Sequence, residues 1–316
     1  MKIKLFGFVV LGILLAMPAV FGACGSSEST DTATGGDTGG GGSDAGCMPK
    51  CDAAACGDAD GCGGKCSGTC PEGKTCSAAY VCDAGQTFTA TLTDFQTKGI
   101  VENVNVEVYD DETGEATGIK GKTDANGKVA LTGIPASKVT IGIMSKKANY
   151  LQTLQYHFTA NATDEKILIV SQSTVSLIAT VLGVTPDDTK GVAAGGVFWG
   201  DRSCSTPIGC ATVTTDPAGA EPVHYFDDTG FPTKTRDALG TNKLDGLFTV
   251  INTTPGKVTI TATVGTANAS SVLPNLPAHT LAISNVYFDK ATYTTDPTPA
   301  TCAGNAPDGG TCGGDQ

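Results

Sequence analysis

Positive charge is scarce in this sequence. Arg202 and Arg236 are its only arginines, and 20 basic residues (Lys+Arg) stand against 32 acidic ones (Asp+Glu), which gives a net charge of −12. A chain this acidic repels phosphate backbones and anionic lipid headgroups. We therefore expect no nucleic-acid partner.

Signatures of catalysis are scarce as well. The three histidines, His157, His224 and His279, are spread along the chain, and neither H-E-x-x-H nor G-x-S-x-G occurs. Tyr225 follows His224 directly, so on a strand their side chains point to opposite faces and do not form the Tyr/His iron sites of some sandwich enzymes. We predict no enzyme activity, and we expect no catalytic residues, no metal and no cofactor.

The first 23 residues have the layout of a secretory signal peptide. Lys2 and Lys4 precede an apolar run over residues 5–16, and Pro18 then breaks any helix. The alternative is an uncleaved membrane anchor, because the apolar stretch is just long enough to span a bilayer. Pro18 and the small residues at the end of the stretch favour cleavage.

Cys24 is the odd one among 13 cysteines. The residues Phe21, Gly22, Ala23 and Cys24 resemble a bacterial lipobox, with phenylalanine in place of the usual leucine. The resemblance implies that residues 1–23 are removed and that Cys24 carries a diacylglyceryl group and an N-acyl chain, which together hold a protein firmly on a membrane. The remaining cysteines are even in number, which suits disulfides.

A tether follows, over residues 24–46. After the lipidated Cys24 it has eight glycines, eight serines and threonines, four acids and no large apolar side chain. Such a composition cannot form a core, so we predict a disordered spacer with an average reach of roughly 25 Å.

The next segment, residues 47–82, is dense in cysteine and almost without large apolar side chains. Disulfides rather than a hydrophobic core must hold this cysteine module together. Zinc is the alternative, but the spacing contains no C-x₂-C and no histidine lies nearby. We expect four disulfides here, in a pairing that the sequence does not determine, and two more elsewhere, Cys204–Cys210 and Cys302–Cys312. The cysteines of the module are Cys47, Cys51, Cys56, Cys62, Cys66, Cys70, Cys76 and Cys82.

Short alternating runs follow the cysteine module. In residues 103–110 valines alternate with polar residues, and in residues 257–264 apolar side chains alternate with threonines, as in strands with one buried face. Turn-forming stretches separate these runs, and no helical period follows the signal segment. We predict an all-β protein with two antiparallel β-sandwich domains, residues 86–172 and 173–297, and a tail at 298–316.

Two stretches of these domains echo each other. Residues 123–141 and 244–260 each place the tetrapeptide KVTI eleven residues after a turn glycine, with a proline in between, which favours an internal duplication. With its T-D-x-x-G hairpin and G-I-P turn, the chain resembles the carboxypeptidase regulatory-like, transthyretin-like sandwich family over roughly residues 95–150. That resemblance implies a sandwich that is usually an accessory, binding or spacer module. The stretch CGDADGCGGKCSGTCPEGKTC resembles cysteine-rich modules of exported myxobacterial proteins, which implies an exported bacterial protein.

A long segment of distinctive composition, residues 200–245, interrupts the second domain. Loops on a rigid scaffold often carry function, so one hypothesis is a ligand or partner surface. The alternatives are a calcium site at the two adjacent aspartates, without EF-hand spacing, and a surface loop whose aromatic residues cap the sandwich, which the pattern favours. The candidate contact residues are His224, Tyr225, Phe226, Asp227, Asp228, Phe231 and Arg236.

These features predict a non-enzymatic lipoprotein, anchored at the outer membrane or cell surface, that presents β-sandwiches as binding or spacer modules. The expected partners are the membrane, through the lipid, and a protein or a polysaccharide. One alternative is a periplasmic partner subunit of an envelope complex. Another is a hydrolase that uses the segment 200–245.

We predict that Cys24→Ser abolishes acylation and membrane retention, because the thiol is the attachment point of the lipid. Metabolic labelling with a fatty acid and separation of membrane from soluble proteins measure the two effects. A variant that stays in the membrane fraction would show instead that residues 1–23 remain as an uncleaved anchor.

Overall fold

The computed structural model describes residues 50–51, 54–70, 74–76, 80, 82–83, 85–202 and 204–299. The predicted signal peptide, tether and Cys302–Cys312 pair lie outside these residues. The residues that the structure describes all belong to one compact unit, within Cys47–Gln316. Within this part of the chain, no helix is both long and apolar enough to cross a membrane.

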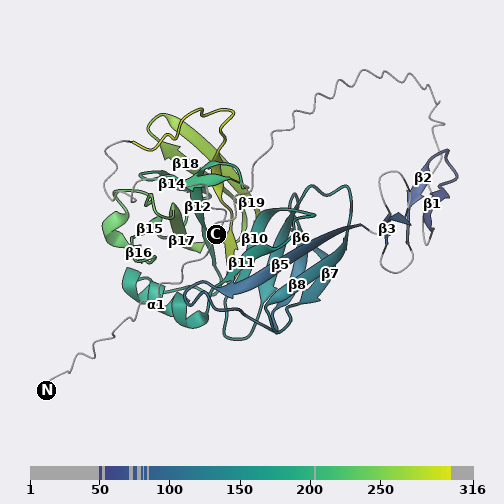
Figure 1. Cartoon of the computed structure of the whole chain (residues 1–316), viewed down its shortest axis with the longest axis horizontal. Helices are drawn as coiled ribbons and strands as arrows, with labels where there is room; N and C mark the ends of the chain where they lie inside the picture. The colour runs from purple at the N-terminus through teal and green to yellow at the C-terminus, as the bar shows by residue number, and fades with distance from the viewer. Residues whose placement is uncertain are drawn as a thin grey trace, which may run out of the picture. The chain divides into compact units, whose positions relative to one another are not determined.

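The regular secondary structure of the described residues is mostly β-strand, as predicted (Figure 1). The cysteine module contains β1 (Cys56–Ala59), β2 (Lys65–Ser67), β3 (Thr75–Cys76) and β4 (Cys82–Asp83). What we call the first half contains β5 (Gln86–Asp94), β6 (Asn105–Asp110), β7 (Ala116–Lys122), β8 (Lys128–Ile134), β9 (Thr140–Lys146), β10 (Gln152–Thr159) and β11 (Glu165–Ile169). The second half contains β12 (Gly191–Gly200), β13 (Ser205–Pro207), β14 (Thr212–Asp216), β15 (His224–Phe226), β16 (Pro232–Thr233), β17 (Leu247–Thr253), β18 (Gly256–Val264), β19 (Ala267–Leu276), β20 (Thr280–Ile283) and β21 (Val286–Phe288). The described helices are α1 (Gln172–Leu182) and the short 3₁₀ helix η1 (Lys234–Arg236).

The two halves repeat one order of strands. In the first half β11–β5–β8 form one sheet while β6, β9 and β10 are neighbours in another; in the second half β20–β12–β17 and β14–β18–β19 are arranged in the same way. In the first half, the first strand β5 pairs in parallel with β11 and antiparallel with β8. In the second half, the first strand β12 pairs in parallel with β20 and antiparallel with β17. The first KVTI stretch runs into the start of β9 and the second lies within β18, and these are corresponding strands. The sequence echo therefore marks a repeated topology.

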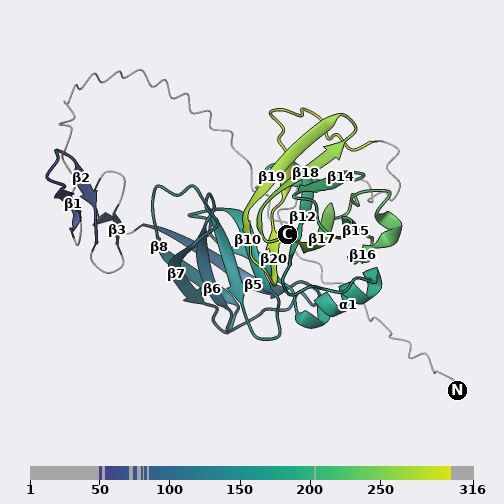
Figure 2. The same ribbon diagram turned by 180° about the vertical axis from the view of Figure 1, so that it is seen from behind.

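One sheet runs through both halves. Strand β10 is paired in parallel with β20, with Gln152 opposite Thr280 and Gln155 opposite Ile283. This pairing merges sheets from the two halves into a single sheet of 11 strands, and Figure 2 shows β10 beside β20 at the junction. The sequence predicted antiparallel pairing only. The alternation of apolar and polar residues reveals which face of a strand is buried, but it does not reveal which strand lies beside it or in which direction that strand runs. The sequence therefore did not predict the parallel pairs.

The two hydrophobic cores lie on opposite faces of the shared sheet. On β9, Ile143 belongs to the first core and the next residue, Met144, belongs to the second. On β10, Leu154 reaches the second core whereas Phe158 reaches the first. The register of β10 breaks between Gln155 and Phe158, where His157 has a φ of 67°. After this bulge, the even-numbered side chains point to the opposite face of the sheet.

Helix α1 corrects the expectation that no helix follows the signal segment. Its sequence, QSTVSLIATVL, is rich in β-branched residues and therefore resembles a strand. Capping residues determine its limits: the Ser171 hydroxyl accepts a hydrogen bond from the Thr174 N–H, and Gly183 ends the helix at a φ of 60°. Val175 packs against a small third core that covers β20 through Leu281.

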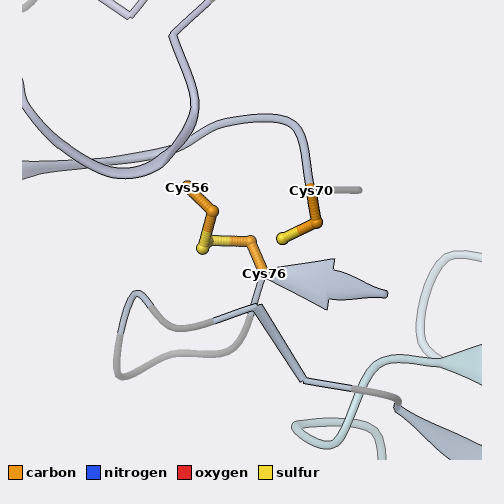
Figure 3. Close-up of side chains that lie close together, drawn as sticks. All are labelled: Cys56, Cys70 and Cys76. Atoms are coloured by element: carbon orange, nitrogen blue, oxygen red, sulfur yellow. A yellow bond between two sulfur atoms is a disulfide. The ribbon is translucent and has the colours of Figure 1, made fainter. Parts of the chain in front are cut away.

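The cysteine module is held by disulfides, as predicted. Three complete bridges are described, Cys51–Cys66, Cys56–Cys76 and Cys70–Cys82, and Cys62 is also disulfide-bonded. The sulfurs of Cys56, Cys70 and Cys76 lie within 4.8 Å of one another (Figure 3). Among the described residues of the module, Cys66 is the one buried hydrophobic side chain, so covalent bonds stand in for an apolar core.

The predicted Cys204–Cys210 disulfide is wrong. Cys210 is disulfide-bonded, but no bridge in the described part of the chain joins it to Cys204. The residues between them include the extended strand β13, which pairs with β12. The two ends of an extended segment lie far from each other, whereas a disulfide requires its two Cα atoms to lie roughly 4.4–6.8 Å apart.

We predict that Leu154→Ala lowers the free energy of unfolding by about 2–5 kcal/mol, because it opens a cavity in the second core from a strand of the first half. Leu154 is 0% exposed, whereas Val139, the matched control, is 77% exposed, and Val139→Ala should change stability by about 0.5 kcal/mol or less. Guanidinium titration followed by circular dichroism gives both values. Equal effects of the two substitutions would contradict the shared core.

Candidate functional site

The strand β15 places the first three candidate contact residues inside the protein. His224, Tyr225 and Phe226 are all buried. The Tyr225 hydroxyl accepts a hydrogen bond of 2.8 Å from the Val213 N–H, and burial raises its pKa. The Phe226 ring meets the edge of Phe95, with ring centroids 6.2 Å apart. Tyr225 therefore contributes to the second core, and Phe226 packs against Phe95, which follows β5 of the first half.

His224 and Asp237 form a closed pair. The Nδ1 atom of His224 lies 3.0 and 3.1 Å from the two carboxylate oxygens of Asp237. The imidazole is 0% exposed, and its Nε2 atom has no hydrogen-bond partner among the described residues. A histidine that exchanges protons with a substrate must reach it directly or through one water. No substrate can approach this ring without local opening of the fold.

Arg236 and the aspartates of the segment hold its turns. The Arg236 guanidinium is buried and donates hydrogen bonds to the carbonyls of Gly240 and Thr241, at 3.3 and 2.9 Å. The Asp227 carboxylate accepts hydrogen bonds from the backbone and hydroxyl of Thr229. In contrast, Asp228 accepts one of 3.0 Å from the Asn242 amide. The two adjacent aspartates thus face different partners rather than one common point, and contact through Asp228 or Phe231 stays a prediction.

Side chains outside the segment 200–245 link the two halves. His157 connects Asp111, at 2.8 Å from Nδ1, with the Val272 carbonyl in β19, at 2.9 Å from Nε2. Both partners are acceptors, so both ring nitrogens donate only in the imidazolium form. The Tyr156 hydroxyl donates a hydrogen bond of 2.7 Å to the Asn275 carbonyl, also in β19. The sequence offers no signal for the two contacts with β19, because they join residues more than 100 positions apart.

Arg202 adds a third link between the halves. Its guanidinium carbon lies 4.0 Å from the centroid of the Phe158 ring, and one nitrogen lies 3.1 Å from a carboxylate oxygen of Glu165. Arg202 follows β12, whereas Phe158 and Glu165 belong to β10 and β11 of the first half. A planar guanidinium can stack on an aromatic ring and pair with a carboxylate at once, which lysine cannot do as well.

An open cleft lies elsewhere, at one end of the shared sheet. A cleft of about 280 Å³ lies where the turn between β9 and β10 meets the first residue of α1. We call it the polar cleft, and no candidate from the segment 200–245 contributes to it. A signal was present in the sequence: Lys146 and Lys147 are adjacent in an otherwise acidic chain. The polar cleft is lined by Asn105, Lys146, Lys147, Ala148, Tyr150, Gln152, Gln172 and His279.

Comparison with known proteins identifies no family. No family model matches the chain, and no curated protein matches it. Among solved structures, the minor pilin GBS52 of Streptococcus agalactiae is 10% identical to this chain, with a TM-score of 0.19. The match covers 64% of this chain and 95% of the pilin. The shaft pilin SpaA of Lactobacillus rhamnosus GG is 8% identical with a TM-score of 0.21, and the match covers 64% of this chain and 97% of the pilin. The TIE protein of Bacillus anthracis is 9% identical with a TM-score of 0.21, and this chain spans 34% of its length. Such values carry no argument about function.

The link through Asp111 generates a prediction about pH. Burial favours the neutral acid, but hydrogen bonds from His157 and Thr140 outweigh it and hold the pKa of Asp111 below its ordinary value of 3.8. A carboxylate whose pKa is lowered by folding stabilises the protein above its unfolded pKa, and this stabilisation is lost as pH falls through the folded pKa. Asp111→Asn should therefore cost about 1–3 kcal/mol near neutral pH. The difference from the parent protein should shrink below pH 3.8.

The matched control is Asp188→Asn. Asp188 also pairs with a histidine Nδ1, that of His279 at 3.1 Å, but its side chain is 86% exposed against 7% for Asp111. An exposed pair contributes about 0–1 kcal/mol. Urea titrations near neutral pH and near pH 3 measure both variants. Equal losses in the two variants, or a loss in Asp111→Asn that does not depend on pH, would show that this link does not stabilise the junction.

Proposed function

We propose that this protein is a non-enzymatic lipoprotein, anchored through Cys24 at the outer membrane or cell surface, that holds a fused pair of β-sandwiches away from the membrane as a binding or spacer module. The observation that carries the proposal is the single sheet through both halves. Backbone pairing of β10 with β20 and three side-chain links make the halves one body. A spacer needs such coupling, because independent domains on a flexible linker would not keep a fixed distance.

The environments of the histidines support a role without catalysis. His224 is sealed inside the second half. His157 uses both ring nitrogens to join the two halves. His279 is exposed and pairs with Asp188. A hydrolase that uses the segment 200–245 would need His224 or its neighbours at an open surface, and the burial of β15 disfavours that alternative.

The second candidate function differs only in the side of the membrane that the protein faces. A periplasmic partner subunit of an envelope complex would carry the same lipid, tether and rigid body. The two functions separate by accessibility, because an external protease reaches only what is displayed outside the cell.

We predict that proteinase K releases the folded body from intact cells by cutting the tether. Residues 25–46 are rich in glycine, serine and threonine and contain no lysine or arginine, so trypsin cannot cut there and serves as the matched control. Immunoblotting of the supernatant for the released body measures the outcome, with a periplasmic protein as a marker of cell integrity. Complete protection in intact cells, with cleavage after the outer membrane is opened, would contradict surface display and establish the periplasmic alternative.

A further inference from the structure

A row of polar side chains crosses the first half next to the polar cleft. The register of the sheet places Asn105 of β6 between Lys122 of β7 and Lys146 of β9. Residues directly opposite one another in a sheet lie on the same face. Val104 and Val106, on either side of Asn105, belong to the first core, so the row lies on the opposite face of the sheet. We call Lys122, Asn105 and Lys146 the lysine row.

The row carries positive charge that the rest of the protein does not neutralise. Among the described residues, neither Lys122, Lys146 nor Lys147 takes part in an ion pair. In contrast, Lys120, two residues before Lys122 and on the same face of β7, pairs with Glu107 at 3.3 Å. The Lys147 ammonium donates a hydrogen bond to the backbone carbonyl of Glu102 rather than to a carboxylate. Three lysines without a carboxylate partner thus lie together at this end of the sheet, in a chain with a net charge of −12.

Carboxamide groups lie beside these lysines. Asn105, Gln152 and Gln172 line the polar cleft, and their side-chain amides have no hydrogen-bond partner in the described part of the chain. Each carboxamide offers two donors and an acceptor, which suits hydroxyl groups. The half-buried Tyr150 ring forms part of the same wall.

The spacing of the row determines which ligand fits. Neighbouring strands are about 4.8 Å apart, which is close to the length of one pyranose ring in a polysaccharide. A sugar chain that crosses the strands would therefore present successive residues to Lys122, Asn105 and Lys146 in turn. Lysine binds a carboxylate as a point charge, and the amides bind sugar hydroxyls. A neutral glycan would leave the lysines unused.

We propose that the lysine row and the polar cleft bind an acidic polysaccharide whose sugars carry uronate carboxylates. The inference rests on the proposed role as a binding module and supplies its ligand class. It does not depend on the anchor or on the side of the membrane that the protein faces. Failure of the binding test would leave an anchored spacer, whereas failure of the cell-surface test would leave the ligand site unaffected.

The test is titration calorimetry of the full mature protein, purified in detergent, with an oligomer of galacturonic acid. We expect binding that weakens with added salt, and no binding of a dextran oligomer of the same length, because dextran has no charge. The double variant Lys122→Gln/Lys146→Gln should weaken binding by about tenfold or more, since it removes two charge-assisted contacts. Circular dichroism confirms that each variant is folded.

Two further variants distinguish a built site from general attraction. Lys120→Gln removes a positive charge from the same face of the same strand, but that charge is already paired with Glu107; it should change affinity by about twofold or less. Asn105→Ala leaves the charge unchanged and should still weaken binding by about threefold or more, through the lost hydrogen bonds. No binding of the galacturonate oligomer, equal binding of dextran, or equal losses in Lys120→Gln and the double variant would each overturn the proposal.

Discussion

The parallel pairing of β10 with β20 holds the two halves of the protein in a single sheet, and the other features of the fold follow from it. Because the sheet is continuous, its central strands bury both faces, and the two cores are packed on opposite sides. Met144, Leu154 and Tyr156 belong to the first half by sequence and to the second core by contact. The second half therefore has no complete core without the first, and the repeated topology is a fused pair rather than two independent domains.

Local features of the fold could be predicted from the sequence because they depend on neighbouring residues. Alternating valines at 104, 106 and 108 identify a half-buried strand, and all three are buried in the first core. The cysteine density of the module identified a disulfide-held segment. The echo of KVTI indicated a repeat, which the strand order of the two halves displays.

Features that depend on distant residues could not be predicted in this way. The partner of a strand edge, the contacts of His157 with Val272 and the position of Arg202 on Phe158 depend on residues brought together only by folding. Helix α1 was missed for a different reason. Its β-branched residues match strand preferences, and the caps at Ser171 and Gly183 outweigh them. The lysine row was missed because the alternation that defines strands says nothing of which polar residues lie side by side.

The parallel junction also has a mechanical consequence. When two paired strands are pulled in opposite directions along their length, all the hydrogen bonds between them are loaded together, whereas pulling across the pair would break them one after another. The pairing of Gln152 through Gln155 with Thr280 through Ile283 is short, but the contacts of Tyr156, His157 and Arg202 stand beside it and share the load. The hydrogen bonds and side-chain contacts at the junction would therefore resist a pulling force along these strands together. The fused sheet is suited to bearing force as well as to holding a fixed length.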